Sequence, residues 1–511
     1  MSSAHLDNPP ATVPARSIVG LFAGVGLALG LGSFEGAAVQ GIFPYMAGGL
    51  STSSYDALWT LTYYIVHWAL GITLMPWTTA RFGERRVFQT AVAVAGTGTL
   101  ISALTHSLWI MLVSRGMEGL AAGLLVPLSQ SLFLRATPPR RHGLVTVFWS
   151  NAMLIPSFIG PAVGGWLTID MGFRFVFWFA LPLFGLAFAL GSRNVPVRTQ
   201  APVTTPFDAP GFILLYFGLM TLQVILDQGE ENGWWHSPFI LHMTLLSLGF
   251  FYLFAWRERR TPYPLLRFHY LKQRNYALGL SLLGLGWALF MGWASTLPLW
   301  AEEYLGYNGL WGGILILPIG LSALPLSTVL EHLRNLLGLR RLATLSLLLL
   351  AAAYGSVDLS PQTALTNLFW PLLLLGCGVG ILFVPLMMII MSEIPPALIA
   401  SAATTTNFIR VFSANIGVSL LFVYWSRGAA RANAALSAEW LRYTPRHQAG
   451  LHAAQAYLAA EAHSLSLDNL LRLSMWLCLI GAAAAWFFLV PPRILPTAAH
   501  SYVEELEREA S

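Results

Sequence analysis

Long apolar runs alternate along the chain with short polar or charged loops. Each run holds about 20 mostly apolar residues, enough for one helix to cross a bilayer at a rise of about 1.5 Å per residue. The runs fall near residues 17–45, 57–79, 87–106, 108–134, 143–168, 174–192, 209–227, 238–256, 276–300, 309–331, 341–358, 364–391, 400–426 and 469–490. The pattern therefore predicts an all-α integral membrane protein with fourteen transmembrane helices.

The runs fall into groups of six, two and six, because a polar linker follows the sixth run and an Arg-rich loop follows the eighth. We interpret residues 17–192 and 276–490 as two six-helix bundles and residues 209–256 as two inserted helices. Residues 1–16 and 491–511 are expected to be cytoplasmic tails. The long Ala-rich segment 427–468 is expected outside the membrane, either as a solvated helical hairpin or as a docking surface.

Composition supports a bilayer as the solvent of this chain. Of the 511 residues, 56% are hydrophobic and 10% are charged, whereas about 25% of the residues of a typical soluble domain are charged. Cys377 and Cys478 both lie within apolar runs, which argues against a disulfide framework or a metal cluster. The first run is too long for a signal peptide and lacks a clear cleavage site, so we expect it to be retained as a helix.

The positions of the basic residues predict the orientation. Most of the 28 Lys and Arg residues lie in the loops that follow even-numbered runs or in the tails. The positive-inside rule therefore places both termini in the cytoplasm. The net charge of +5 then faces the inner membrane surface, and nucleic acid is not an expected partner.

Five ionisable residues lie deep within the predicted helices, namely Glu35, His67, Arg115, Glu118 and Arg410, and three of them, Glu35, Arg115 and Glu118, lie at similar depth. Their distances from the helix ends place all three about 10–15 Å below the outer surface. A charge at the centre of a membrane helix costs about 2.5–3.5 kcal/mol, so a functional role is the default hypothesis. We predict that the two carboxyls exchange protons while Arg115 tunes them. A static ion pair that holds helices together is the alternative.

The ninth run presents an aromatic and flexible face of the kind that suits varied apolar ligands. The predicted substrate-binding residues are Phe43, Tyr63, Trp287, Phe290, Met291, Trp293, Asn407 and Arg410. Contacts with lipid or with other helices are the alternative for each aromatic residue, and Arg410 is expected either to reach toward the cytoplasm or to line a vestibule beside Asn407. His67 is more simply explained as a helix contact than as a proton carrier.

Several motifs resemble those of major facilitator drug:proton antiporters. The antiporter motif of the fifth span is matched by IPSFIGPAVGGWL, the arginine motif of the fourth by LWIMLVSRGMEG, the loop motif by TTARFGERRVF, and the acidic motif of the fourteen-span branch by GSFEGAAVQGIFP. The matched residues are Gly160, Pro161, Gly164 and Gly165; Arg115 and Gly119; Arg81, Gly83 and Arg86; and Glu35. LDQGEENGWW, RNYALG and SAATTTNFIRVFSANIG resemble EmrB-type exporters in particular.

This resemblance covers nearly the whole chain and implies the major facilitator fold with 6+2+6 helices. It implies proton-driven efflux of small hydrophobic or amphipathic compounds across the bacterial inner membrane, without a cofactor. It also implies a periplasmic membrane-fusion adaptor of the EmrA/HlyD type and an outer-membrane channel. The chain departs from the family motifs at Ala80, Pro156 and Glu118, where an acid, a small residue and Gln are usual. An exporter of one endogenous metabolite and a membrane scaffold are the alternatives; no nucleophile–base set, HExxH motif or phosphate loop indicates an enzyme.

Overall fold

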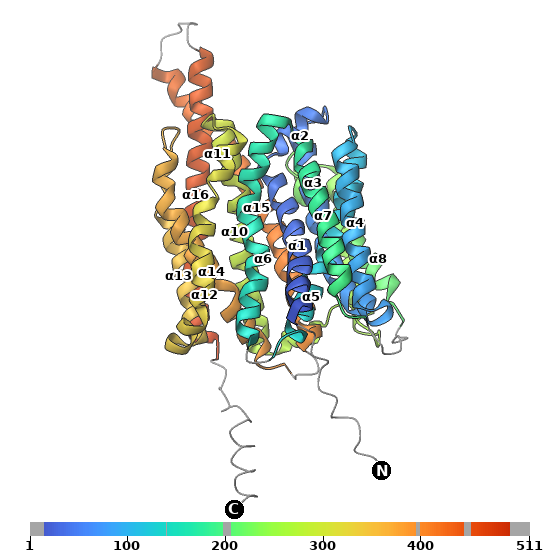
Figure 1. The fold of residues 1–511 in the computed structure, drawn as a ribbon. Coiled ribbons are helices and arrows are strands. Elements are labelled where there is room, and N and C mark those ends of the chain that lie inside the picture. Colours follow the sequence, from blue (N-terminus) through green and yellow to red (C-terminus); the bar gives the residue numbers. More distant parts are fainter. Residues whose placement is uncertain (1–14, 139–140, 198–205, 395–398, 444–450, 491–511) are drawn as a thin grey trace, which may run out of the picture.

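The computed structural model describes residues 15–138, 141–197, 206–394, 399–443 and 451–490, which form α-helices joined by short loops (Figure 1). The helices are α1 (Ala15–Gln40), α2 (Phe43–Gly49), α3 (Ser54–Phe82), α4 (Glu84–Leu104), α5 (Leu108–Arg135), α6 (His142–Met171), α7 (Arg174–Asn194), α8 (Ala209–Gln228), α9 (Pro238–Glu258), α10 (Arg274–Tyr304), α11 (Gly309–Ile314), α12 (Leu317–Leu337), α13 (Leu339–Gly355), α14 (Leu365–Met391), α15 (Ile399–Tyr443) and α16 (Leu451–Phe488).

The predicted fold class is confirmed. In the described part of the chain, thirteen helical segments are long and apolar enough to cross a membrane, and α11 and α12 share one of them. The fourteenth span is α13, whose 17 residues pack against α14 and α16. At a rise of about 1.5 Å per residue, α13 is about 26 Å long, slightly less than the hydrocarbon core of about 30 Å.

Two of the predicted runs are divided by prolines. The first run breaks after Gln40, and α2 begins with Pro44 in its first turn. The tenth run breaks at Leu315 and Ile316, and Pro318 lies in the first turn of α12. Proline lacks an amide hydrogen and is tolerated where a helix begins, so each break follows from the local sequence.

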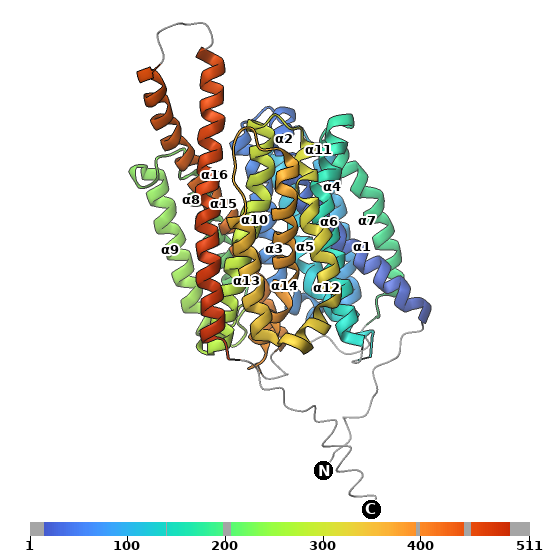
Figure 2. The ribbon, with the colours of Figure 1, turned by 90° about the vertical axis from the view of Figure 1, so that its left-hand side faces the viewer.

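The helices run roughly parallel and define two ends of the molecule. α1 begins and α16 finishes at the same end, which we call the terminal end (Figure 1). α15 and α16 extend beyond the other helices at the opposite end, which we call the hairpin end (Figures 1 and 2). Segment 427–468, expected to lie outside the membrane, is thus largely helical, and residues 444–450 lie outside the described part.

The helices form two packed groups. In the first, α1 packs against α6 and α7, and α5 packs against α3 and α4. In the second, α10 packs against α14 and α15, and α13 packs against α14 and α16. The groups meet where α3 contacts α15 and where α6 contacts α11 and α12. The predicted inserted helices α8 and α9 lie together on one side, where α8 also contacts α3 and α15 (Figure 2).

Candidate functional site

Arg115, Glu118 and Glu35 form one buried cluster, as their equal depth predicts. Their exposed fractions are 0%, 1% and 1%. A guanidinium nitrogen of Arg115 donates to Glu118 Oε2, one turn further along α5. The other oxygen of Glu118 accepts from Ser102 Oγ of α4 at 2.6 Å. Glu118 is therefore the carboxylate that pairs with Arg115.

Glu35 contacts Arg115 through its main chain and not through its carboxylate. Arg115 Nη2 donates to the carbonyl oxygen of Glu35 at 3.3 Å, and Arg115 Nε donates to the carbonyl oxygen of Thr60 at 3.4 Å. The carboxylate of Glu35 instead accepts from Thr99 Oγ1 of α4 at 2.7 Å. The Glu35 carboxylate thus has a hydroxyl as its partner among the described residues, and the cation beside it is already paired with Glu118.

Tyr64 of α3 separates this acid cluster from a central cavity. The Arg115 guanidinium carbon lies 4.2 Å from the centre of the Tyr64 ring, in a cation–π contact. The Tyr64 hydroxyl donates to the carbonyl oxygen of Gly32, three residues before Glu35. The same side chain lines the cavity, together with Gly36 and Ala37 of α1. The Tyr64 side chain therefore connects the acid cluster with the cavity.

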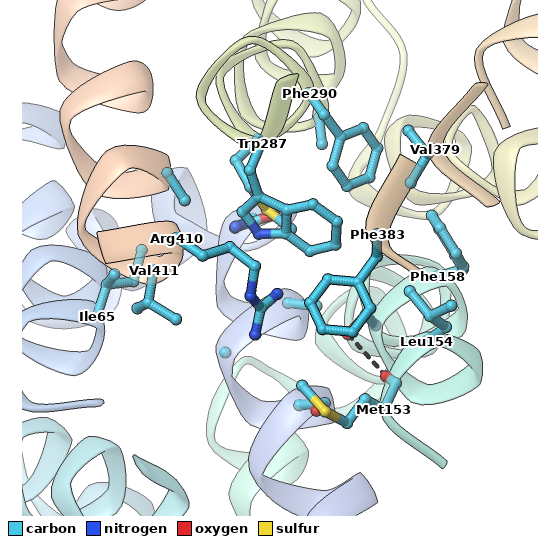
Figure 3. A pocket seen from close by; sticks show the side chains of 18 of the residues that line it. Ile65, Met153, Leu154, Phe158, Trp287, Phe290, Val379, Phe383, Arg410 and Val411 are labelled. Atoms are coloured by element: carbon cyan, nitrogen blue, oxygen red, sulfur yellow. Dashed lines mark hydrogen bonds between the residues drawn. The ribbon is translucent and has the colours of Figure 1, made fainter. Parts of the chain in front are cut away.

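The cavity has a volume of about 130 Å³ and lies between the two helix groups. The first group lines it with α1, α3 and α6, and the second with α10, α12, α14 and α15. Figure 3 shows its aromatic and aliphatic wall, which includes Trp287, Phe290, Phe383, Met153, Leu154 and Phe158. Such a wall suits an apolar ligand held by few polar groups.

Among the described residues that line the cavity, Arg410 of α15 alone carries a charge. Its side chain lies between the rings of Trp287 and Phe383, with centroid distances of 4.7 and 5.2 Å (Figure 3). Only 4% of the residue is exposed, and its Nε has no hydrogen-bond partner in the described part of the chain. The cavity therefore offers a buried guanidinium that pairs with no anion among the described residues.

Four of the predicted substrate-binding residues line this cavity, namely Trp287, Phe290, Met291 and Arg410. Three others do not, and helical periodicity explains two of them. The lining stripe of α3 is Leu61, Tyr64, Ile65 and Trp68. Tyr63 lies on another face, beside His67, whose Nδ1 contacts the Tyr63 carbonyl oxygen at 2.7 Å. Trp293 is likewise rotated off the lining face of α10 and donates to Ser474 Oγ of α16 at 3.1 Å.

Asn407 is the third residue outside the cavity wall. It lies one turn before Arg410 on α15, and its amide donates to the carbonyl oxygen of Ala403 at 3.1 Å. Phe43 begins α2, and its side chain lies outside the described part. Sequence reasoning missed Tyr64 and Phe383. The apolar spacing of α3 carries a signal for Tyr64, whereas nothing in the sequence singles out Phe383 in the long apolar run of α14.

The glycines of the predicted antiporter motif pack α6 against two different helices. A Cβ on Gly160 or Gly164 would meet α1 at 3.1 Å, at Phe34 O and at Ala38 respectively. A Cβ on Gly165 would lie 2.2 Å from the carbonyl oxygen of Gly309, which belongs to α11 of the other helix group. Pro161 lines the cavity beside them. The motif thus makes both a contact within one group and a contact between the groups.

The predicted gating loop joins α3 to α4 at the terminal end. Gly83 adopts a φ of 80°, which a glycine accepts readily, and Arg81 and Arg86 are exposed beside it. Glu84, the first residue of α4, forms an ion pair with Arg135 at the end of α5. An acid is thus present in this loop, four residues after Ala80.

This arrangement, two groups of spanning helices around an apolar central cavity with α8 and α9 beside them, is that of a multi-pass membrane transporter. The family model of the Major Facilitator Superfamily matches residues 21–418, and the chain belongs to that superfamily. The predicted recognition of the family is therefore confirmed, as is the expectation of a transporter rather than an enzyme.

Proteins similar to this chain agree with this assignment. The chain is 28% identical over 460 residues to the fatty acid resistance protein FarB of Neisseria gonorrhoeae, covering 90% of each chain. It is 28% identical over 413 residues to the multidrug export protein EmrB of Escherichia coli, covering 80% of each chain. A crystal structure of the peptide transporter POT superposes with a TM-score of 0.63 at 16% identity, covering 92% of this chain and 96% of that one, which shows the shared fold.

Proposed function

We propose that this transporter exports amphipathic compounds with an apolar body and an acidic group, in exchange for protons. The observation that carries the proposal is the position of Tyr64, which contacts Arg115 of the buried acid cluster and lines the substrate cavity. Proton binding and ligand binding can therefore affect each other through one side chain. The EmrB and FarB relatives are named for multidrug export and fatty acid resistance, which supports efflux.

The acid cluster needs one proton to become neutral. Two carboxylates and one guanidinium carry a net charge of −1 when all three are ionised. Burying an unpaired charge is costly, and a buried carboxylate avoids that cost by taking up a proton. Because Glu118 is paired with Arg115, we assign the exchangeable proton to Glu35, whose carboxylate accepts from Thr99. Proton binding to Glu35 and proton release from it would then favour different arrangements of α1 and α4.

Arg410 suggests the chemistry of the substrate. A guanidinium binds carboxylates through charge-assisted, directional hydrogen bonds, and this one has no anion to bind among the described residues. A ligand with a carboxylate or another acidic group would supply the missing partner, while its apolar part would contact Trp287, Phe290 and Phe383. The name of the FarB relative, a fatty acid resistance protein, points to the same ligand chemistry.

We propose that the terminal end faces the cytoplasm and that the hairpin end faces the periplasm. Arg81, Arg135, Arg334 and Arg340 lie at or beside helix ends on the terminal side, as the positive-inside rule requires of cytoplasmic loops. The membrane potential then contributes about 2.3 kcal/mol per charge per 100 mV. One proton at about 150 mV thus supplies about 3.5 kcal/mol, and a substrate that leaves as an anion adds a second moving charge of the same sense.

The extended ends of α15 and α16 are our candidate for adaptor docking. They are held together near their base, where Ser466 Oγ donates to the Trp425 carbonyl oxygen at 2.7 Å and Gly428 packs against Ser466. A paired helical hairpin that rises above the membrane suits contact with a periplasmic adaptor of the membrane-fusion class, which in turn would reach an outer-membrane channel. Deleting residues 432–460 should abolish resistance in cells but leave transport in proteoliposomes unchanged.

The proton-exchange proposal is tested with inverted membrane vesicles. Addition of a fatty acid or another acidic substrate should release protons from vesicles that contain the wild-type protein. Glu35→Gln should abolish this release while the protein stays folded, because glutamine cannot ionise. The matched control is Glu303→Gln, the same substitution at an exposed position near the end of α10, which should behave as wild type. Proton-coupled efflux that survives in Glu35→Gln would refute the assignment.

A further inference from the structure

The inserted helix α8 carries a buried carboxylate, Asp227, at the junction of the two helix groups. Only 7% of the residue is exposed. Its Oδ2 accepts from Thr62 Oγ1 of α3 at 2.8 Å, and its Oδ1 accepts from Ser419 Oγ of α15 at 2.7 Å. One carboxylate therefore bridges α3 of the first group and α15 of the second.

The amide of Gln223, one turn earlier on α8, completes the site. Its Nε2 lies 2.7 Å from both Asp227 Oδ1 and Ser419 Oγ, and its Oε1 accepts from Asn415 Nδ2 at 2.6 Å. All four side chains around Asp227 are less than 5% exposed. Three hydrogen-bond donors thus converge on the two carboxylate oxygens, which is the set that an ionised carboxylate, an acceptor only, requires.

No cation of the described residues pairs with Asp227. The described titratable and charged groups on the adjoining elements are Asp56, Tyr63, Tyr64, His67 and Arg81 on α3; Tyr216 on α8; Arg410, Tyr424, Arg427, Arg431 and Glu439 on α15; His242, Tyr252, Arg257 and Glu258 on α9; and Glu230 and Glu231 just after α8. Of these, Arg427 is held in an ion pair with Glu230. His67 contacts the Tyr63 carbonyl oxygen. A buried carboxylate that is held by neutral donors can be neutralised in place by a proton.

The Asp227 site and the acid cluster of Glu35, Arg115 and Glu118 lie on opposite faces of α3. Thr60 and Tyr64, one turn apart, face Arg115, whereas Thr62 faces Asp227. Successive helix residues differ by about 100°, so Thr62 points about 200° away from each of them. The two carboxylate sites are therefore at one level of the same helix.

We propose that Asp227 is a second proton-binding site, loaded and emptied as α3 moves against α15. The proposal rests on the proposed proton exchange, which uses Glu35 alone, and adds a second exchangeable proton. Its ligand is the proton, taken from water at the hairpin end and released to water at the terminal end.

Separation of the helix groups would act directly on this site. Thr62 and Ser419 belong to different groups, so when the groups move apart at least one of them leaves Asp227. The carboxylate then loses a donor and meets water, and a proton binds to the oxygen that was vacated. When the groups close again, the hydroxyl returns as a donor and the proton leaves. A proton that binds more tightly to one arrangement also stabilises that arrangement. Proton binding at Asp227 therefore shifts the equilibrium between the arrangements, and the movement in turn changes the proton affinity of Asp227.

The experiment measures how steeply transport depends on the proton gradient in proteoliposomes. We compare wild type with Asp227→Asn, and use Asp208→Asn as the matched control. Asp208 is also a buried Asp of α8, but it caps the helix and pairs with Arg257 away from the junction of the groups. Substrate accumulation at steady state is recorded over a range of proton gradients, and thermal unfolding confirms that each variant is folded.

Asp227→Asn should reduce the number of protons exchanged per substrate from two to one, while Asp208→Asn keeps two. At a proton gradient equivalent to about 120 mV, the loss of one proton lowers the accumulation ratio about 100-fold. An unchanged accumulation ratio in a folded Asp227→Asn protein would overturn the second proton site but leave the proposed function intact. Wild-type protein that moves no protons at all would instead overturn the proposed function.

Thr62→Val keeps the test decisive if the asparagine variant does not fold. This substitution removes a donor to Asp227 and preserves both the carboxyl group and the side-chain volume. Without that donor the ionised carboxylate is less stable in the closed arrangement, so the proton should stay bound. The number of protons exchanged per substrate should then again fall from two toward one. A folded Thr62→Val protein that exchanges as many protons per substrate as wild type would count against the proposal as clearly as an unchanged accumulation ratio in Asp227→Asn.

Discussion

Substitution of Gly165 by alanine should open the hairpin end of the transporter. In the structure, α6 and α11 touch there through main-chain atoms, because neither Gly165 nor Gly309 carries a side chain. A Cβ on Gly165 would lie 2.2 Å from the carbonyl oxygen of Gly309, 2.3 Å from its carbonyl carbon and 2.6 Å from the amide nitrogen of Leu310. Main-chain atoms cannot rotate aside, so the two helices must separate.

The size of the effect follows from these distances. Ordinary contact begins near 3.4 Å, so the helices must move apart by about 1.2 Å. Inserting a methyl group into a packed site costs about 1–3 kcal/mol. That cost applies only while the hairpin end is closed, since the contact is lost when the two groups separate. The equilibrium should therefore shift toward the arrangement open at the hairpin end by about 5- to 150-fold.

The assay measures distances between spin labels across this contact. Asp170→Cys at the end of α6 and Trp311→Cys on α11 are both exposed positions, introduced after Cys377→Ala and Cys478→Ala remove the native thiols. Gly165→Ala should increase the population with a long distance between the labels. The matched control is Gly185→Ala on α7, where a Cβ would have no atom within 4 Å.

The result that would refute this reasoning is a folded Gly165→Ala protein with the same distance distribution as wild type and Gly185→Ala. Gly313→Ala provides an independent check, because its Cβ would lie 2.3 Å from the amide nitrogen of Ala162 on α6. If neither alanine widens the separation, the close contact between α6 and α11 does not hold the hairpin end closed. The antiporter motif would then serve packing against α1 alone.

Three further predictions concern the cluster and the cavity. Glu118→Gln leaves Arg115 buried without its anion and should destabilise the protein by about 3–5 kcal/mol, far more than Glu35→Gln, in thermal unfolding; equal losses would contradict the pairing. Arg410→Gln should raise the KM for acidic substrates by about 10- to 100-fold, and leave the KM for neutral dyes unchanged, in measurements of efflux kinetics. Equal effects on the two KM values would exclude a carboxylate-binding role for Arg410. Tyr64→Phe should cost about 1 kcal/mol of stability and keep coupling, whereas Tyr64→Ala should cost about 3–5 kcal/mol and reduce proton release per substrate; intact coupling in Tyr64→Ala would remove Tyr64 from the proposed pathway.

The sequence predicts the fold better than the cavity, for physical reasons. Membrane helices must satisfy their main-chain hydrogen bonds internally, so each appears as an uninterrupted apolar run that can be counted. The same uniformity hides which face of a helix lines the cavity, because lipid-facing and cavity-facing residues are both apolar. The sequence therefore predicts Tyr63 and Trp293 together with Trp287, although Tyr63 stacks on His67 of its own helix and Trp293 donates to Ser474 of α16.

Charged residues were more informative, but their partners were not predictable. The equal depths of Glu35, Arg115 and Glu118 anticipated one cluster, yet only the structure shows that Arg115 binds the carboxylate of Glu118 and the main chain of Glu35. Asp227 ends its apolar run, so the sequence alone predicts a residue within reach of water. It is buried because Thr62 and Ser419, far away in the chain, pack against it, and no local pattern encodes that contact.

The positions of the charges also constrain how substrate and protons would be coupled in the proposed exchange. Arg410 belongs to α15 in the second helix group, whereas Glu35 and Glu118 belong to α1 and α5 in the first. An acidic substrate held by Arg410 therefore does not displace a proton from its own binding residue, as a cationic substrate would if it bound to the proton-carrying carboxylate. The proposed exchange must instead depend on relative movement of the two helix groups, and α3 is suited to transmit that movement. Its Tyr64 contacts the cavity and Arg115, its Thr62 contacts Asp227, and it packs directly against α15.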